Sequence, residues 1–419
     1  MPCKGNAQMM RDQIVQAHVH KKRDEFIASI NEDDVLALAK SHHKGDNCRF
    51  FKDPARGSYN ICFFIEFDPP ADQAESENSD RERWVVRIPL TPCLAFGGRS
   101  KLEMSYIADE TDIPIPKIHA YAIGDDLDPL SSFILLEYIS GEQLSWAQLK
   151  SLSPADRESL YASIADIYIQ LRRLELSSIG CLISGLDGIR VGKKTASIDI
   201  NMQELEGLRP STIQDSFPNK SSANEHMEML LQIAENALIN GRSSITDERG
   251  PEVLYHLHIF RYLDKGPFVL VHGDFEPQNL VMTKEWKIAA VLNWEWSRVV
   301  PVQLFHPPLW LMEFDSTHLA CQWIYDARLI TTFSRFNSIV REQEMARYGQ
   351  PMLYQEWEKR GEDGGLLVAN ALMNWTDIDY VSYQYVNEKC YGGCDDLDTR
   401  VAAFMEEDPS RRCLAGLPG

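Results

Sequence analysis

The sequence has little of several features that mark common classes of protein. No apolar run approaches the roughly 20 residues of a membrane-spanning helix, and the N-terminal stretch lacks the apolar core of a secretory signal. Lys and Arg number 42 against 62 Asp and Glu, and the formal net charge of −20 disfavours nucleic-acid binding. The nine Cys are scattered, and the closest pair, Cys390 and Cys394, lacks the spacing of most zinc or redox knuckles. We therefore expect a cytoplasmic protein with reduced thiols that binds neither membranes nor nucleic acid, and its oligomeric state stays open.

What the chain does contain is enough apolar material for sizeable cores, with 44% hydrophobic residues over 419 positions. Residues 1–47 are polar and helical in pattern, and we treat them as an N-terminal extension. The acidic, Pro-containing stretch 68–82 is typical of a solvent-exposed loop. β-Branched and aromatic runs predict strands at residues 48–51, 59–67, 83–90, 117–123 and 133–139.

After Gly141 the pattern becomes helical. Residues 151–174 have apolar positions every three to four residues, with Ser153 as a cap and Pro154 at the first helical position. The order of strands and then helices predicts an α+β protein with a strand-rich lobe at 48–140 and a helix-rich lobe at 141–419.

One short motif carries most of the chemical information. The apolar run 268–271 leads into His272 and Asp274, and Asn279 follows five residues later. This H-x-D-x-x-x-x-N spacing is that of the catalytic loop of the kinase fold, in which the Asp orients an attacking hydroxyl and the Asn holds magnesium. His272 is better suited to support the loop by hydrogen bonding than to act as a base. The motif therefore predicts phosphoryl transfer with Asp274 as the catalytic base.

Phosphoryl transfer also needs a loop over the nucleotide phosphates and a cation that pairs with them. Gly57 and Ser58 lie between the first two predicted strands, where such a loop belongs, although an ordinary hairpin turn explains them equally well. Arg87 lies inside an apolar strand, which is costly for a charge without a partner. Because a guanidinium can meet phosphate oxygens in bidentate fashion, Arg87 is the candidate cation, and a strand-end Arg facing water is the alternative.

A second metal position is expected after the next predicted strand, where Asn293 is followed by Glu295. An Asn oxygen can bind magnesium but lacks the charge of a carboxylate. Two residues apart on a strand, Glu295 would lie on the same face as Asn293 and could supply that charge. We therefore predict metal ligands at Asn279, Asn293 and Glu295, unless the site has lost catalysis.

These segments resemble the aminoglycoside phosphotransferase and choline kinase-like group, in the form widespread in fungi. The resemblance is carried over residues 50–312 by the segments GSYNICF, WVVRIPLTP, FILLEYISG, FVLVHGDFEPQNLVM and AAVLNWEWS. It implies a bilobal protein-kinase-like fold, ATP and Mg²⁺ as cofactors, and a small-molecule hydroxyl as acceptor. It also implies that the segment ending at Glu137 and Tyr138 borders the adenine.

Two departures from this group touch the nucleotide and metal site. Asn293 stands where the group has a metal-binding Asp, and the helix that should supply a Glu to pair with Arg87 is short, with Glu103 as the nearest candidate. Three hypotheses follow: a small-molecule phosphotransferase with a weakened metal site, a degenerate pseudokinase-like binding protein, or a biosynthetic enzyme that reuses the fold. The substrate cannot be read from the sequence, although acidic residues such as Glu276 would suit an amine.

Overall fold

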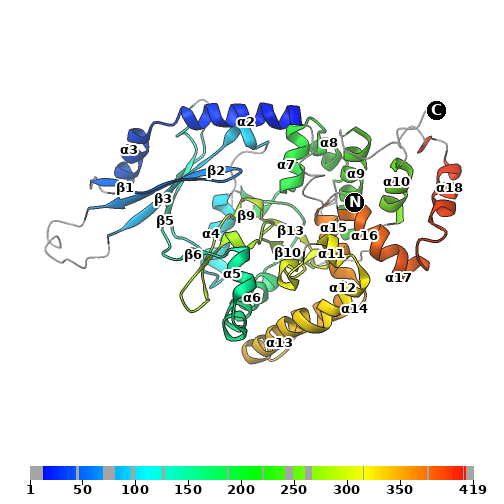
Figure 1. The fold of residues 1–419 in the computed structure, drawn as a ribbon. Helices are drawn as coiled ribbons and strands as arrows, with labels where there is room; N and C mark the ends of the chain where they lie inside the picture. The colour runs from blue at the N-terminus through cyan, green and yellow to red at the C-terminus, as the bar shows by residue number, and fades with distance from the viewer. Residues whose placement is uncertain are drawn as a thin grey trace.

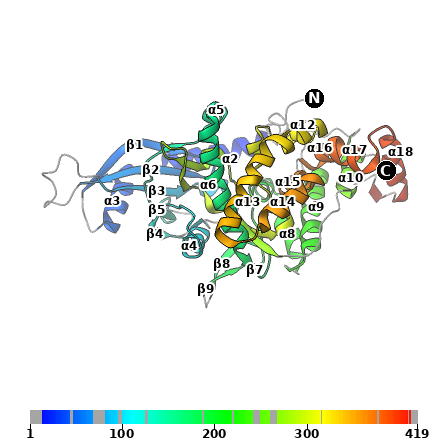
Figure 2. The ribbon, with the colours of Figure 1, turned by 90° about the horizontal axis from the view of Figure 1, so that it is seen from below.

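A computed structural model of the chain describes most of its length. The described residues are 13–43, 47–68, 81–95, 100–124, 128–185, 188–218, 221–240, 249–259, 267–314, 316–374, 377–408 and 410–411. The loop predicted at 68–82 therefore lies largely outside the described residues. Figures 1 and 2 show a strand-rich part that contains the first five strands with the N-terminal helices, and a helix-rich part that contains the segments after the fifth strand.

The strand-rich part is built on one antiparallel sheet with the strand order β1-β2-β3-β5-β4. Its strands are β1 (Cys48–Arg56), β2 (Asn60–Phe67), β3 (Arg83–Pro89), β4 (Ile118–Ala122) and β5 (Phe133–Glu137). All five strands predicted from the sequence are confirmed. The main difference is β1, which continues through Pro54 to Arg56, with irregular register where it passes Lys52.

The alternation of side chains along these strands divides the sheet into two faces. The outer face carries Phe63, Ile65 and Val86, which are buried beneath the helices α2 (Gln13–Ala28) and α3 (Glu32–His42). The opposite face carries Val85, which packs against the core of the helix-rich part. Arg87 lies two residues beyond Val85 and so points to that same inner face. The N-terminal helices thus cover the sheet from outside and leave Arg87 directed toward the rest of the molecule.

Two connections lead from the sheet toward the second part. The helix α4 (Ser100–Glu110) follows β3 and packs against the short 3-10 turn η3 (Trp294–Trp296). The fully buried Asn201 bonds to two backbone groups after β3, with its Oδ1 accepting from the Ala95 N–H and its Nδ2 donating to the Cys93 carbonyl. These contacts hold the segment after the central strand β3 against the helix-rich part.

The helix-rich part surrounds three small antiparallel sheets. Its helices are α5 (Trp146–Ser151), α6 (Pro154–Arg173), α7 (Ile198–Leu205), α8 (Pro210–Asp215), α9 (Ala223–Asn240), α10 (Gly250–Ile259), α11 (Ser316–Leu319), α12 (Gln322–Arg328), α13 (Ser334–Tyr348), α14 (Met352–Glu362), α15 (Gly365–Met373), α16 (Ile378–Val381), α17 (Asn387–Tyr391) and α18 (Leu397–Glu407). Its strands are β6 (Glu142–Gln143), β7 (Glu175–Leu176), β8 (Leu182–Gly185), β9 (Gly188–Val191), β10 (Phe268–Val271), β11 (Leu280–Met282), β12 (Ile288–Val291) and β13 (Arg298–Pro301).

The central helix α6 begins as its sequence predicts. The Ser153 hydroxyl accepts a hydrogen bond from the Asp156 N–H, and Pro154 occupies the first helical position. Its buried face packs against β10 and the long helix α13. Because β10 leads directly into the segment at 272–279, this packing sets the position of that segment. Among the described helices, none is both long and apolar enough to cross a membrane.

Candidate active site

The loop after β10 contains a position, 273, that only glycine can occupy without strain. Gly273 has φ +82°, and a Cβ added there would lie 2.1 Å from the carbonyl oxygen of Trp296. β10 pairs with β13 on this side, so the backbone of the following segment cannot move away freely. The close approach of two backbones therefore turns the chain sharply just before Asp274.

We expect Gly273→Ala to lower the free energy of unfolding by about 3 kcal/mol or more, because the substitution adds an overlap to the cost of a left-handed backbone. Gly349, at the end of α13, is the matched control, since its φ is +71° but a Cβ there would meet nothing within 4 Å. Gly349→Ala should cost only about 1–2 kcal/mol. Denaturant unfolding of both variants measures the difference, and equal losses would contradict a steric role for Gly273.

His272 supports the loop through hydrogen bonds at both ring nitrogens. Its Nε2 lies 2.8 Å from the Leu292 carbonyl oxygen, and its Nδ1 accepts from the Asp274 N–H at 3.2 Å. This pattern requires the neutral ring with the proton on Nε2. Burial lowers the pKa of His272 to about 4, so the ring stays neutral near pH 7. His272 is thus a positioning residue, as the sequence suggested.

Asp274 is positioned by hydrogen bonds from Asn279. The Asn279 Nδ2 donates to both the carbonyl oxygen and the Oδ2 of Asp274, at 2.7 and 2.9 Å. Burial raises the pKa of Asp274 to about 6, and the charge of Glu295 adds to the rise while the Asn279 hydrogen bond opposes it. Burial and the Asp274 charge likewise raise the pKa of Glu276 to about 7. A carboxyl with a pKa of about 6 is suited to accept a proton near neutral pH.

The second predicted group of residues gathers around Arg87. The Arg87 guanidinium donates to the Asn293 Oδ1 and to the Glu295 Oε1, the latter at 2.5 Å. Asn60, at the start of β2, also donates to the Glu295 Oε1, at 2.9 Å. The Asn293 Nδ2 in turn donates to the Asn279 Oδ1. A continuous chain of hydrogen-bonded side chains therefore runs from Asp274 through the two Asn residues to Arg87.

Asn293 and Glu295 lie close together in the structure, but not on one strand face as the sequence pattern predicted. The strand β12 ends at Val291, and Asn293 has a left-handed backbone with φ 65°, which Asn tolerates better than most residues. Glu295 lies in the following 3-10 turn, so the two residues do not share a strand face. Both side chains nevertheless reach Arg87 because the turn folds back toward the sheet.

The side chains present can be compared with what a magnesium ion needs. Glu295 offers the carboxylate, and its Oε2 is buried without a hydrogen-bond partner among the described residues. The side-chain oxygens of Asn279 and Asn293 are suitable magnesium ligands, but each already accepts a hydrogen bond from a neighbouring side chain. The donor set fits one divalent cation, provided that the two amide oxygens exchange these hydrogen bonds for it.

The residues predicted around the nucleotide are placed less tightly. Gly57 and Ser58 lie exposed in the turn between β1 and β2, and no positive φ requires the glycine. Glu137 ends β5 and Tyr138 directly follows it, with the Tyr138 N–H donating to the Arg83 carbonyl oxygen. The side chain of Glu103 lies outside the described residues. These assignments remain predictions.

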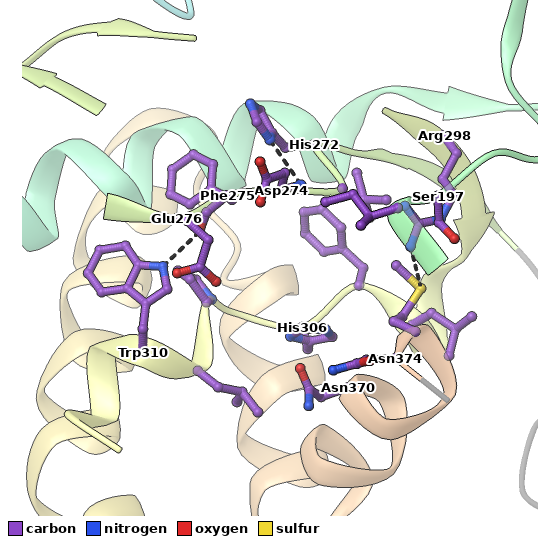
Figure 3. A pocket seen from close by; sticks show the side chains of 18 of the residues that line it. Ser197, His272, Asp274, Phe275, Glu276, Arg298, His306, Trp310, Asn370 and Asn374 are labelled. Atoms are coloured by element: carbon purple, nitrogen blue, oxygen red, sulfur yellow. Dashed lines mark hydrogen bonds between the residues drawn. The ribbon is translucent and has the colours of Figure 1, made fainter. Parts of the chain in front are cut away.

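A cavity of about 610 Å³ opens beside the loop at 272–276. Figure 3 shows Asp274 and His272 along one wall, with Glu276 and Trp310 toward one end and Arg298 and Ser197 toward the other. Between these ends lie three polar side chains, His306, Asn370 and Asn374. The Trp310 Nε1 donates to the Phe275 carbonyl oxygen at 2.7 Å, which ties that wall to the loop.

Sequence reasoning missed most of this cavity wall. Arg298 could have been found, because it stands in an apolar strand as Arg87 does. Asn370 lies in α15 and Asn374 directly follows that helix, a four-residue spacing that a helical pattern places on one face. Asn60 gave no signal, since an Asn at a hairpin turn is ordinary.

The chain is similar to several known proteins. Two curated relatives, the acyl-CoA dehydrogenase family member 11 of Pongo abelii and that of Homo sapiens, are each 23% identical over 187 residues, which is 44% of this chain but only 19% of theirs. Among solved structures, the streptomycin-ATP-APH(2")-IIa ternary complex is 14% identical, with a TM-score of 0.41 over 85% of this chain and 92% of that chain. The GDP and kanamycin complex of APH(2")-IIia is 12% identical, with a TM-score of 0.44 over 90% of this chain and 99% of that chain.

The chain also matches the model of a protein family. The model of the phosphotransferase enzyme family, APH, matches residues 72–302, which is more than half of the 419 residues. The matched region includes Arg87, the loop with Asp274 and Asn279, and the turn with Asn293 and Glu295. The predicted bilobal, protein-kinase-like α+β fold is thereby confirmed, and the chain belongs to the phosphotransferase enzyme family.

Proposed function

We propose that the protein transfers a phosphoryl group from ATP to a hydroxyl of a small molecule, with Asp274 as the general base. The observation that carries this proposal is the position of Asp274, which lines the cavity of about 610 Å³ while Asn279 holds one of its carboxylate oxygens. The hydrogen-bonded chain from Asp274 to Arg87 connects the acceptor side of the site with the cation expected to meet the phosphates.

The chemistry asks little of the side chains beyond position and charge. Asn279 donates to the Asp274 Oδ2 and leaves the Oδ1 to accept the proton of the attacking hydroxyl. Neutral His272 fixes the backbone of Asp274 and of Leu292 in one arrangement. Arg87, once released from Glu295 or shared with it, would meet phosphate oxygens through its two outer nitrogens.

Asn279, Asn293 and Glu295 would hold a single Mg²⁺ ion, which when bound supplies positive charge to the phosphates. The buried, unpartnered Glu295 Oε2 supports this assignment. The single carboxylate in the set is expected to give a weaker magnesium site than two carboxylates would.

A second candidate function is nucleotide binding without turnover. It is favoured by one observation: the Asn279 and Asn293 oxygens and one Glu295 oxygen are already engaged within the cluster by Asn293, Arg87 and Asn60. A site that keeps these bonds would hold a nucleotide through Arg87 at most and would leave the metal out.

A metabolite phosphorylation screen with ATP and Mg²⁺ tests the main proposal, with ATP binding measured in parallel with and without the metal. We expect a phosphorylated hydroxyl product and magnesium-dependent ATP binding. ATP binding that ignores magnesium, with no product from any metabolite, would favour the second candidate. Absence of both ATP binding and product would reject the two together.

The raised pKa of Asp274 gives the reaction a specific pH dependence. The base must be deprotonated, so we expect kcat/KM to fall about tenfold per pH unit below about 6 and to level off above it. The profile should be measured with the accepted substrate in constant-ionic-strength buffers. Glu276→Gln is the control, because it removes the neighbouring acid whose pKa is about 7 and should leave the limb near 6 in place. A profile that stays flat from pH 5 to 8 would argue against Asp274 as the base.

A further inference from the structure

One buried cation in the cavity is not used by the chemistry described above. Arg298, at the start of β13, is 6% exposed and lines the cavity with Asp274. No described carboxylate lies within ion-pair distance of Arg298. Its Nη1 donates to the Trp296 carbonyl oxygen at 3.2 Å, and its Nη2 donates to the Met373 sulfur at 3.3 Å. A thioether is a weak acceptor, and Asp199 acts on the guanidinium only through its charge, without a salt bridge, so within the described part of the chain Arg298 has no strong acceptor beyond one carbonyl oxygen.

Arg360 shows how this chain treats a buried Arg with a structural role. It donates to four carbonyl oxygens, those of Val302, Gln303, Phe305 and Glu356, and its Nη2 lies 3.6 Å from the Glu356 carboxylate. Burial lowers the pKa of both Arg360 and Arg298 to about 10, so both remain charged near pH 7. Arg298 pays the same desolvation cost without comparable partners, which is expected where a ligand completes the set.

Arg298 is also close to the reacting residue. A Cβ placed on Gly273 would lie 2.9 Å from the Arg298 Nη1, so the guanidinium lies against the backbone immediately before Asp274. In Figure 3 Arg298 and Glu276 lie toward opposite ends of the cavity, with Asp274 along the wall between them. A small molecule in the cavity can therefore face both Arg298 and Asp274.

We propose that the acceptor substrate is a hydroxy acid, whose carboxylate binds Arg298 while its hydroxyl faces Asp274. The position of the hydroxyl rests on the function proposed above, whereas the anion site rests on Arg298 alone. A carboxylate would accept two N–H groups of the guanidinium and replace the weak Met373 contact. The competing outcome is an amino alcohol, whose ammonium group would pair with an acid of the cavity. Four acids line it: Asp199, Asp274, Glu276 and Asp377.

The test compares acids with their neutral and cationic analogues on the full chain. The probes are ω-hydroxy carboxylates of two to six carbons, the matching amides and the matching amino alcohols. Binding is measured by calorimetry without nucleotide, so the result does not depend on phosphoryl transfer. For at least one chain length we expect the acid to bind about ten- to a hundredfold more tightly than its amide, which is the range for a charge-assisted hydrogen-bonded pair.

Variants separate Arg298 from the rest of the surface. Arg298→Gln should remove the preference for the acid over the amide, and Arg298→Lys should keep part of it. Arg335→Gln is the control for loss of one positive charge, because Arg335 is an exposed residue on α13 that pairs with Glu158. It should bind the acids as the wild type does. If Arg298→Gln fails to fold, the comparison of acid and amide on the wild type and on Arg298→Lys still decides.

The outcomes distinguish this proposal from the proposed function. Acid binding that depends on Arg298, without any ATP turnover, would support the anion site and reject the phosphotransferase. Turnover of an amino alcohol, with no preference for acids, would support the phosphotransferase and overturn the hydroxy acid. A wild type that binds none of the acids, or an Arg298→Gln variant that keeps the full preference, would also overturn it.

Discussion

Replacing Asp274 by Asn is expected to lower turnover about a hundred- to ten-thousandfold, because the acceptor hydroxyl loses its positioned base. ATP affinity should change little, because Asp274 lines the cavity of the proposed acceptor and is separated from Arg87 by Asn279 and Asn293. The amide keeps the size and shape of the carboxyl group, so the loop around Gly273 should be preserved. Steady-state kinetics and nucleotide titration of the wild type and the variant measure the two effects.

The same substitution should make the protein more stable, which separates a lost base from a damaged fold. Burial raises the pKa of Asp274 to about 6 in the folded protein, above the roughly 4 of an unfolded chain. The folded state therefore binds this proton more tightly, and the charged carboxylate destabilises it increasingly as the pH rises from about 4 to about 6. At pH 7 Asp274→Asn should raise the free energy of unfolding by up to about 3 kcal/mol, and below pH 4 the gain should vanish.

Denaturant unfolding at pH 4 and pH 7 checks this pattern. Lower stability at both pH values, together with lower turnover, would mean that Asp274 is needed for the fold and that the kinetic loss says nothing of a base. Unchanged turnover in a well-folded variant would remove Asp274 from the reaction.

The sequence predicted the elements of this fold well where local signals and tertiary packing agree. The strand β10 and the turn at Gly273 follow from an apolar run that ends in a residue free to adopt positive φ. The helix α6 follows from its cap at Ser153 and its periodicity. In each case the residues that form the element are adjacent in the chain, so the local sequence is sufficient to predict it.

The site was predictable only in part, because its geometry depends on residues far apart in the chain. The sequence indicates that Arg87 is a costly buried charge, but it does not show that Glu295 lies 2.5 Å from it. The contact arises because the turn after β12 folds back to the sheet, which a strand pattern cannot show. Arg298 and the Asn residues in and directly after α15 meet in the cavity only through the packing of separate elements. The covering loop at Gly57 has no geometric feature that separates it from a hairpin turn.

The pair of Arg87 and Glu295 gives the second large expected effect. The two side chains are 10% and 14% exposed, so each compensates the other in a largely buried setting. Glu295→Gln leaves the guanidinium without a carboxylate, and we expect a loss of about 3 kcal/mol in the free energy of unfolding. If Glu295 also supplies the charge of the metal site, this variant should have no magnesium-dependent turnover.

The double variant Asn293→Asp with Glu295→Gln separates the effect of charge from that of position. The Asn293 oxygen already accepts from Arg87, so an Asp there restores one carboxylate next to the guanidinium but removes the hydrogen bond that the Asn293 Nδ2 donates to the Asn279 oxygen. We expect the double variant to regain part of the lost stability under either functional hypothesis, because the ion pair does not depend on catalysis. Its activity differs between them. In a working phosphotransferase, the new carboxylate should restore magnesium-dependent turnover at least in part, and Asn293→Asp alone should tighten magnesium-dependent ATP binding. In a degenerate site, that part of the stability should return while neither turnover nor magnesium-dependent binding appears in any variant.

The experiment uses four proteins: the wild type, Glu295→Gln, Asn293→Asp and the double variant. ATP turnover and ATP binding are measured across a magnesium titration, and stability is measured by denaturant unfolding. The results distinguish a metal site rebuilt around Glu295 from an ion pair with a structural role only.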